Sequence, residues 1–170
     1  MDTLLIMGMK DEFKRGRDWI AEHLSLDTMA GDVSVFEFNI RFICGLLTSY
    51  ALTKDKMFLD KAEDFAKKML PAFDTPKEIP YALINPKNGF AKNYAWASSG
   101  CSVLSEIGTL HLEWVYLSEL TGNPIYKEKV MKIRNLLQSK TKPNGLYPNY
   151  VNPKTGAWCQ REYLFIDQYL

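Results

Sequence analysis

The sequence has 170 residues, of which 46% are hydrophobic and 13% aromatic, and its formal net charge is +1. This balance is typical of a globular protein and unlike that of disordered or fibrous chains. Because Lys and Arg are interspersed with Asp and Glu, the sequence offers no basic stripe for phosphates, and we expect no nucleic-acid partner. The longest strongly apolar stretch, residues 42–53, is shorter than the roughly 20 residues of a membrane-spanning helix. We therefore expect no membrane segment in this chain.

The segment 35–53 is predicted to form an enclosed helix, because it is apolar nearly all round and carries only Glu37 and Arg41 as charged residues. These two residues are four apart, so they share one face of a helix and can pair. Ser34 and Glu37 also fit a capping box at the helix start. The alternative interpretation is a carboxylate and a guanidinium in a shielded cavity, where pKa values are readily tuned. Both stay open, because a helix start can hold a functional acid.

The next segment, 56–70, is predicted to form an amphipathic helix with one solvent-exposed face, since its lysines lie opposite an apolar stripe. The same succession of an apolar helix and a lysine-rich helix recurs at 102–120 and 124–139. The residues between these two helices are typical of a helix end followed by a helix start. They are a C-terminal glycine, a capping asparagine and a proline at the first helical position: Gly122, Asn123 and Pro124.

An internal repeat divides the sequence into two helical units. The segments Asn85-Pro-Lys-Asn-Gly89 and Asn152-Pro-Lys-Thr-Gly156 have the same pattern, and Leu52-Thr53 and Leu120-Thr121 repeat at nearly the same offset. Each unit is predicted to be a helix, a tight turn, a second helix and a loop. We therefore expect an all-α fold, in which enclosed helices form an inner ring and helices with one solvent-exposed face form an outer ring. A plain two-layer helical array is the alternative.

The two loops at 74–98 and 141–160 are long and rich in Pro, Asn, Gly and aromatic residues. This composition favours short β-hairpins that lie across one end of a ring. Aromatic side chains in such loops either stack on sugar rings or anchor the loop to the core. The candidates are Tyr81, Tyr94, Trp96, Tyr147 and Trp158.

Two further carboxylates, Glu106 and Glu113, are seven residues apart in the second apolar helix, so they are predicted to point the same way. Each could equally be a solvent-facing or capping residue. His111 lies off that face, and we expect a structural role for it. The sequence contains no phosphate-binding loop, nucleophile elbow or zinc spacing. Paired carboxylates in a helical ring with aromatic loops would indicate glycoside chemistry.

The three cysteines, Cys44, Cys101 and Cys159, are far apart and lack the spacing of a zinc or redox motif. We expect Cys44 and Cys101 to be small buried residues within helices. The first residues lead directly into Asp2 and a charged segment, which does not fit a secretory signal. We therefore expect no targeting signal in this chain.

Several blocks of the sequence occur in an order that is characteristic of one enzyme family. They are Asp2-Thr-Leu-Leu-Ile-Met-Gly8, Val35-Phe-Glu37-Phe-Asn-Ile-Arg41, Leu70-Pro-Ala-Phe73, Trp96-Ala-Ser98, Glu106-Ile-Gly-Thr-Leu-His-Leu-Glu113 and Asn144-Gly-Leu-Tyr-Pro148. In this order they resemble the class I α-mannosidases of glycoside hydrolase family 47. Residues 108–113 and 129–134 are most similar to the Golgi α-1,2-mannosidases. We therefore expect residues 1–160 to be the N-terminal portion of an α-mannosidase catalytic domain and 161–170 to be a divergent tail.

The resemblance implies part of an (α/α)7 barrel, a bound calcium ion, and hydrolysis of terminal α-1,2-linked mannose with inversion. By position, it implies that Glu37 is a catalytic proton donor and that Arg41 contacts substrate. Glu106 matches a glutamate that lines the sugar pocket, and Trp96 falls in a pocket-side block. The resemblance also implies a high-mannose N-glycan as partner and a place in the Golgi or the endoplasmic reticulum.

The sequence departs from the family pattern after Trp158. The family continues through a glycine-rich stretch into an Asp-Ser-aromatic-Tyr-Glu-Tyr block with a catalytic aspartate, and Asp167 matches it neither in spacing nor in neighbours. A later catalytic glutamate and a calcium-binding threonine are unmatched too, so we expect the main protein ligand of calcium to be absent from this chain. We therefore expect the chain to be inactive by itself. The alternative is a non-catalytic glycan-binding fragment or a mannosidase-like lectin of quality control.

Overall fold

The computed structural model of the chain describes residues 1–97 and 100–159, so the expected tail at 161–170 lies outside the described residues. The helices are α1 (Asp2–Ile6), α2 (Lys10–His23), α3 (Val35–Phe38), a π-helical turn (Asn39–Ile43), α4 (Cys44–Thr53), α5 (Lys56–Met69), α6 (Leu104–Gly108), α7 (His111–Thr121) and α8 (Ile125–Ser139). Short 3₁₀ turns follow at Leu70–Phe73 and Pro143–Gly145. The chain is thus mainly helical, as expected.

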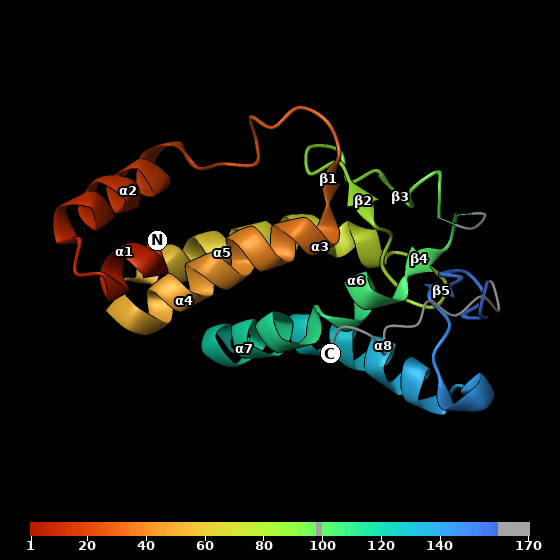
Figure 1. Ribbon diagram of the computed structural model, residues 1–170. Helices are drawn as coiled ribbons and strands as arrows, with labels where there is room; N and C mark the ends of the chain where they lie inside the picture. Colours follow the sequence, from red (N-terminus) through yellow and green to blue (C-terminus); the bar gives the residue numbers. More distant parts are fainter. Residues whose placement is uncertain (98–99, 160–170) are drawn as a thin grey trace.

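Two small antiparallel sheets lie at one end of the helices, and α1 lies toward the other end (Figure 1). The first sheet has the order β1-β2-β3 and the second pairs β4 with β5. The strands are β1 (Val33–Ser34), β2 (Leu83–Ile84), β3 (Ala91–Lys92), β4 (Ser102–Val103) and β5 (Tyr150–Val151). Helices α3 and α6 both begin directly after a strand of these sheets. The sheets therefore fix the starts of the two helices that carry Glu37 and Glu106.

The first apolar helix is continuous from Val35 to Thr53, through α3, the π-helical turn and α4. Its 19 residues are long and apolar enough to cross a membrane, whereas the apolar stretch expected from the sequence was only 42–53. Core helices of soluble proteins pass the same test of length and composition. Here Phe38, Ile43 and Leu46 are buried in the core that the helix shares with its neighbours. The helix is therefore accounted for as a core element.

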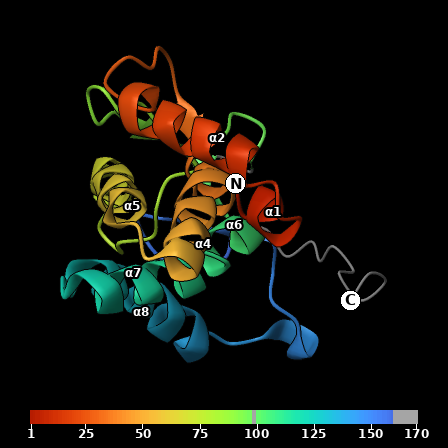
Figure 2. The ribbon, with the colours of Figure 1, turned by 90° about the vertical axis from the view of Figure 1, so that its left-hand side faces the viewer.

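The expectation that this helix is enclosed on every side is wrong for the described structure. Ile40 and Leu52 are exposed, because the elements that pack against the helix cover only part of its circumference. Figure 2 shows α4 with α5 on one side, α7 on another and the N-terminal helices α1 and α2 on a third. By contrast, α5 has the expected single buried face, and its exposed lysines include Lys67.

The single helix expected at 102–120 is broken. Ser102 and Val103 pair with β5 instead, and the helix is interrupted between Gly108 and His111. Glycine is a poor helix former, and the hydroxyl of Thr109 donates to the carbonyl of Ser105, which competes with the helical amide. The second unit therefore carries Glu106 and Glu113 on two separate helices, α6 and α7.

The turn between the helices is built alike in both units, as the repeat predicts. The hydroxyls of Thr53 and Thr121 accept from the amides two residues later, at 3.1 and 3.3 Å. The side chains of Asp55 and Asn123 then cap α5 and α8 through the amides of Met57 and Ile125. Gly122 has a left-handed backbone at the end of α7, as expected, and α8 begins one residue after Pro124.

The repeated Asn-Pro-Lys-x-Gly segments form equivalent turns. Asn85 accepts the amide of Gly89 at 2.9 Å, and Asn152 accepts the amide of Gly156 at 2.7 Å. Both glycines have a positive φ, 74° and 72°, which is a backbone conformation that a β-carbon disfavours. The first turn closes the β2–β3 hairpin and the second leads to a bridge between Val151 and Trp158. The expected hairpin loops are thus confirmed.

The cysteines are arranged differently from the expectation. Cys44 begins α4 but is only half-buried, and Cys101 is buried but lies on the loop before β4. Cys101 forms a disulfide with Cys159, 58 residues later. The long separation explains why spacing alone did not indicate this pair, since the Cys101–Cys159 contact depends on the pairing of β4 with β5.

The core is centred on Trp114 of α7, which is fully buried. Its ring lies 4.8 Å from that of Phe73 and 5.9 Å from that of Tyr126, measured between centroids. Its indole nitrogen donates to Asn39 at 3.1 Å, so the polar tip is also satisfied. The indole therefore joins the first inner helix to α7, α8 and the 3₁₀ turn after α5.

Replacing Trp114 with alanine should lower the free energy of unfolding by about 3–5 kcal/mol, the usual cost of removing a large aromatic side chain from a core. Urea unfolding would measure it. The matched control is Trp19→Ala on α2, where the side chain is 56% exposed and the loss should stay below about 1 kcal/mol. Equal losses for the two variants would contradict this account of the core.

Candidate functional site

The candidate site begins at Ser34, which caps the first inner helix. Its Oγ accepts the amide of Glu37 at 3.2 Å, which is half of the predicted capping box. The carboxylate of Glu37 binds Arg41 instead, with 2.6 Å between Oε2 and the guanidinium Nε. The cap and the predicted Glu37–Arg41 pair therefore occur together. Arg41 restricts the orientation of the carboxylate at the start of the helix.

The side chains of Glu37 and Arg41 are 47% and 69% exposed. Of the two interpretations left open for this pair, the shielded cavity does not hold for the described residues. Shielding requires protein on every side, whereas here Arg41 borders a cavity that it shares with α1 and α2 and much of the pair stays in contact with water. In water, an exposed ion pair of this kind contributes little to stability. The pair matters for the site because it fixes the position of the Glu37 carboxylate, and not because it stabilises the fold.

Two aromatic residues of the loop after β3 lie beside this helix start. The rings of Tyr94 and Trp96 stack, with 4.9 Å between centroids and 14° between planes. The hydroxyl of Tyr94 donates to Ser34 Oγ at 3.3 Å, so the stack is attached to the cap of the Glu37 helix. Trp96 is 67% exposed, which leaves ring surface free for a further ligand. Exposed aromatic faces of this kind are suited to stacking on a sugar ring.

Glu106, in the first turn of α6, faces the same group of residues. Its Oε2 is buried without a hydrogen-bond partner among the described residues. Burial raises the pKa of this carboxyl, the hydroxyl of Tyr94 partly offsets the rise, and the charge of Glu37 adds to it. The pKa of the Tyr94 hydroxyl is also raised, first by burial. The charges of two carboxylates from different helices, Glu106 and Glu37, therefore both act on the Tyr94 hydroxyl.

Glu113 and His111 take no part in this group. Glu113 accepts from the side-chain amide of Asn39 at 3.1 Å, so the break after α6 separates its contacts from those of Glu106. His111 lines a cavity of about 470 Å³ between α6, α7 and α8, and burial and the charge of Arg134 lower its pKa. Asn39 was missed from the sequence, because its one signal is a polar amide within a mostly apolar helix.

The model of one protein family, the glycosyl hydrolase family 47, matches residues 1–168 of the chain. The chain belongs to glycosyl hydrolase family 47. It is 58% identical over 160 residues to the mannosyl-oligosaccharide α-1,2-mannosidase IA of Drosophila melanogaster, which covers 94% of this chain and 24% of that protein. It is 54% identical over 160 residues to the human mannosyl-oligosaccharide 1,2-α-mannosidase IB, with coverages of 94% and 25%. The chain thus spans about a quarter of the length of these curated relatives.

A solved structure of the family has the same arrangement of helices. The α-1,2-mannosidase from Trichoderma reesei superposes with a TM-score of 0.80 at 30% identity, over 92% of this chain and 35% of that one. The likeness confirms the expected fold class: the helical hairpins are part of an (α/α)7 barrel, not of a plain two-layer array. It also places the chain among glycoside hydrolases, with relatives named α-1,2-mannosidases.

Glu106→Gln should raise the urea midpoint at pH 7, because the variant removes the charge of a half-buried carboxylate whose Oε2 has no partner among the described residues. The wild-type carboxyl binds its proton more tightly in the folded state, so its penalty is absent below the unfolded pKa, about 4.3, and grows as the pH rises through the folded pKa. The advantage of the variant should therefore shrink as the pH falls.

The control is Glu119→Gln, since that side chain is 62% exposed and its replacement should have little effect at either pH. A Glu106→Gln variant that is less stable than the wild type at pH 7 would contradict the view that the buried Oε2 of Glu106 makes its charge unfavourable.

Proposed function

We propose that this chain forms the part of an α-1,2-mannosidase that carries the general acid of an inverting hydrolysis. The observation that supports it is the grouping of the Glu37–Arg41 pair with Glu106 and the Tyr94–Trp96 stack, whose Trp96 ring is exposed. In such a reaction one carboxylic acid protonates the leaving oxygen while a second carboxylate activates water on the other face of the sugar. Glu37 is the residue proposed as that acid.

The other members of the group have proposed roles in binding the sugar. Trp96 offers an aromatic face, and Arg41 both orients Glu37 and presents donors to sugar hydroxyls. Glu106 is proposed to line the sugar pocket from α6, beside Tyr94, whose hydroxyl acts on the pKa of its carboxyl. We assign no base for water within residues 1–97 and 100–159.

The family resemblance implies a bound calcium ion, but the side chains of the described residues do not form a set of ligands for it. The described residues contain no group of three or more His, Cys, Asp or Glu side chains that could hold a metal ion. No step of the proposed mechanism is therefore routed through a metal. The roles of Glu37, Arg41, Trp96 and Glu106 follow from their own chemistry.

The proposed substrate class is an oligosaccharide with terminal α-1,2-linked mannose, such as the high-mannose N-glycans processed in the Golgi or the endoplasmic reticulum. The relatives named mannosyl-oligosaccharide α-1,2-mannosidases support the substrate. The disulfide between Cys101 and Cys159 supports the compartment, because disulfides persist in the oxidising secretory pathway.

We also propose that the 170-residue polypeptide releases no mannose by itself, because we assign no base for water among its described residues and because Glu37 and Arg41 are 47% and 69% exposed. Glycan binding without hydrolysis, as in a mannosidase-like lectin, is the second candidate. The exposed Trp96 ring and the exposed Arg41 guanidinium favour it, since both are free to contact a sugar.

A grafted enzyme tests the proposal. The matching segment of the Drosophila relative is replaced by this chain's residues, and release of mannose from Man-α-1,2-Man is measured. The graft should be active, and Glu37→Gln should lower its kcat by about 10²–10⁴-fold, the usual contribution of a general acid. The 170-residue polypeptide, assayed with added calcium, should release no mannose.

The matched control is Glu22→Gln on α2, where the carboxylate is 72% exposed and activity should not change. An active Glu37→Gln graft would contradict the role of Glu37. A graft that binds the disaccharide but never hydrolyses it would favour the lectin, and release by the polypeptide alone would show that its site is complete.

A further inference from the structure

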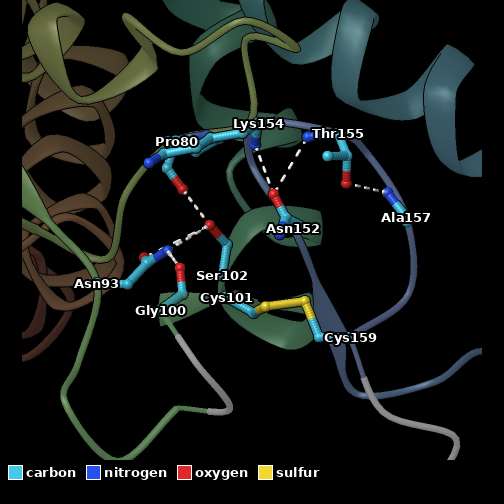
Figure 3. The surroundings of a disulfide bond; sticks show 10 residues. All are labelled: Pro80, Asn93, Gly100, Cys101, Ser102, Asn152, Lys154, Thr155, Ala157 and Cys159. Carbon is cyan, nitrogen blue, oxygen red and sulfur yellow. Dashed lines mark hydrogen bonds between the residues drawn. A yellow bond between two sulfur atoms is a disulfide. The ribbon is translucent and has the colours of Figure 1, made fainter.

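Figure 3 shows the disulfide between Cys101 and Cys159 with its surroundings, which include Asn93, Gly100 and Ser102. Along the chain, Cys101 lies between Trp96 and Glu106, two residues of the proposed sugar site. The disulfide joins the residue before β4 to the residue after the Val151–Trp158 bridge, with 6.5 Å between the two Cα atoms. Cys101 is buried, whereas Cys159 is half-buried. A thiol from solution would therefore reach the sulfur of Cys159 more readily.

On the Cys101 side, a hydrogen-bond network holds the aromatic segment of the site. Asn93 donates to the carbonyl of Gly100 at 2.7 Å and accepts the amide of Ala82 at 2.8 Å. The hydroxyl of the buried Ser102 donates to the carbonyl of Pro80 at 2.8 Å. The two residues that flank Cys101 are therefore fastened to the loop that continues into Tyr94 and Trp96.

On the Cys159 side, the cross-link closes the ladder from which α6 begins. The amide of Cys159 donates to Tyr150 at 3.0 Å, and the amide of Leu104 donates to Asn149 at 2.8 Å. Leu104 is the first residue of α6, and Glu106 follows in the same turn. The position of Glu106 thus depends on a two-residue strand pair that the disulfide locks at its end.

The partial burial of Glu106 favours opening of this short ladder. Glu106 is half-buried, and its Oε2 atom is buried without a partner among the described residues, which favours motions that let water reach this oxygen. Two strands of two residues each form a weak ladder by themselves. A covalent cross-link between distant segments limits such openings by constraining the chain.

We propose that the Cys101–Cys159 disulfide is a redox-sensitive cross-link that holds Glu106 and the Tyr94–Trp96 stack in the site arrangement. Its consequence for sugar binding rests on the proposed function. In reduction by a small thiol such as glutathione, a thiolate attacks Cys159, the bond between the two cysteines breaks, and Cys101 leaves as a thiolate that takes up a proton. A second thiolate then resolves the mixed disulfide, so two cysteine thiols and one oxidised glutathione result.

Hydrogen exchange of the whole chain, oxidised and reduced, tests the proposal. Reduction should speed exchange of the Leu104 and Cys159 amides by about tenfold or more, because a native disulfide typically stabilises by more than a tenfold change in equilibrium constant. Exchange in α5 should not change. The Cys44→Ser variant keeps the disulfide and should respond as the wild type does.

A second variant, Cys101→Ser with Cys159→Ser, should exchange fast at these amides with or without reductant. Unchanged exchange on reduction would overturn the proposal, as would three reactive thiols in the denatured, unreduced protein. Equally fast exchange in α5 would overturn it too, because the effect would then be global.

The same variants separate this inference from the proposed function. If exchange responds to reduction but the oxidised graft releases no mannose, the cross-link stands and the proposed function fails. If the graft is active and exchange does not respond, the function stands and the cross-link fails. With both correct, the doubly substituted graft should show a raised KM for the disaccharide.

Discussion

The buried side-chain amide of Asn39 joins the two inner helices, and the rest of the structure depends on this junction. Its oxygen accepts from the indole of Trp114 and its nitrogen donates to Glu113, each at 3.1 Å. A buried amide is costly unless its groups are satisfied, so the first inner helix is held in one rotation relative to α7. Asn39 begins the π-helical turn, two residues after Glu37. The same rotation therefore decides where Glu37 points.

At the sheet end of the helices, Ser34 has the corresponding role for the site. Its hydroxyl oxygen receives both the amide of Glu37 and the hydroxyl of Tyr94, so one side chain joins the helix cap to the aromatic loop. The second sheet holds Glu106 against this group from the other unit. Glu37, the aromatic stack and the half-buried Glu106 thus come from three segments, which only the folded units bring together.

The features predicted correctly from the sequence are local ones. The Gly122 helix end, the capping by Asn123 and the Asn-Pro-Lys-x-Gly turns each depend on a few neighbouring residues. The features that were missed depend on residues far apart in sequence. The β4–β5 pairing decides both the break in the 102–120 helix and the cross-link of Cys101, and no local pattern encodes it. The exposure of Glu37 was missed for a related reason, because burial depends on which elements pack nearby.

Glu37 is proposed to deliver a proton to the oxygen that leaves the terminal mannose. A crystal structure of the grafted enzyme with Glu37→Gln and bound Man-α-1,2-Man tests this role most directly. The account predicts the amide of residue 37 within about 2.6–3.2 Å of the glycosidic oxygen, with a sugar ring against Trp96. A disaccharide bound with its glycosidic oxygen out of reach of residue 37, even through one water, would contradict the account.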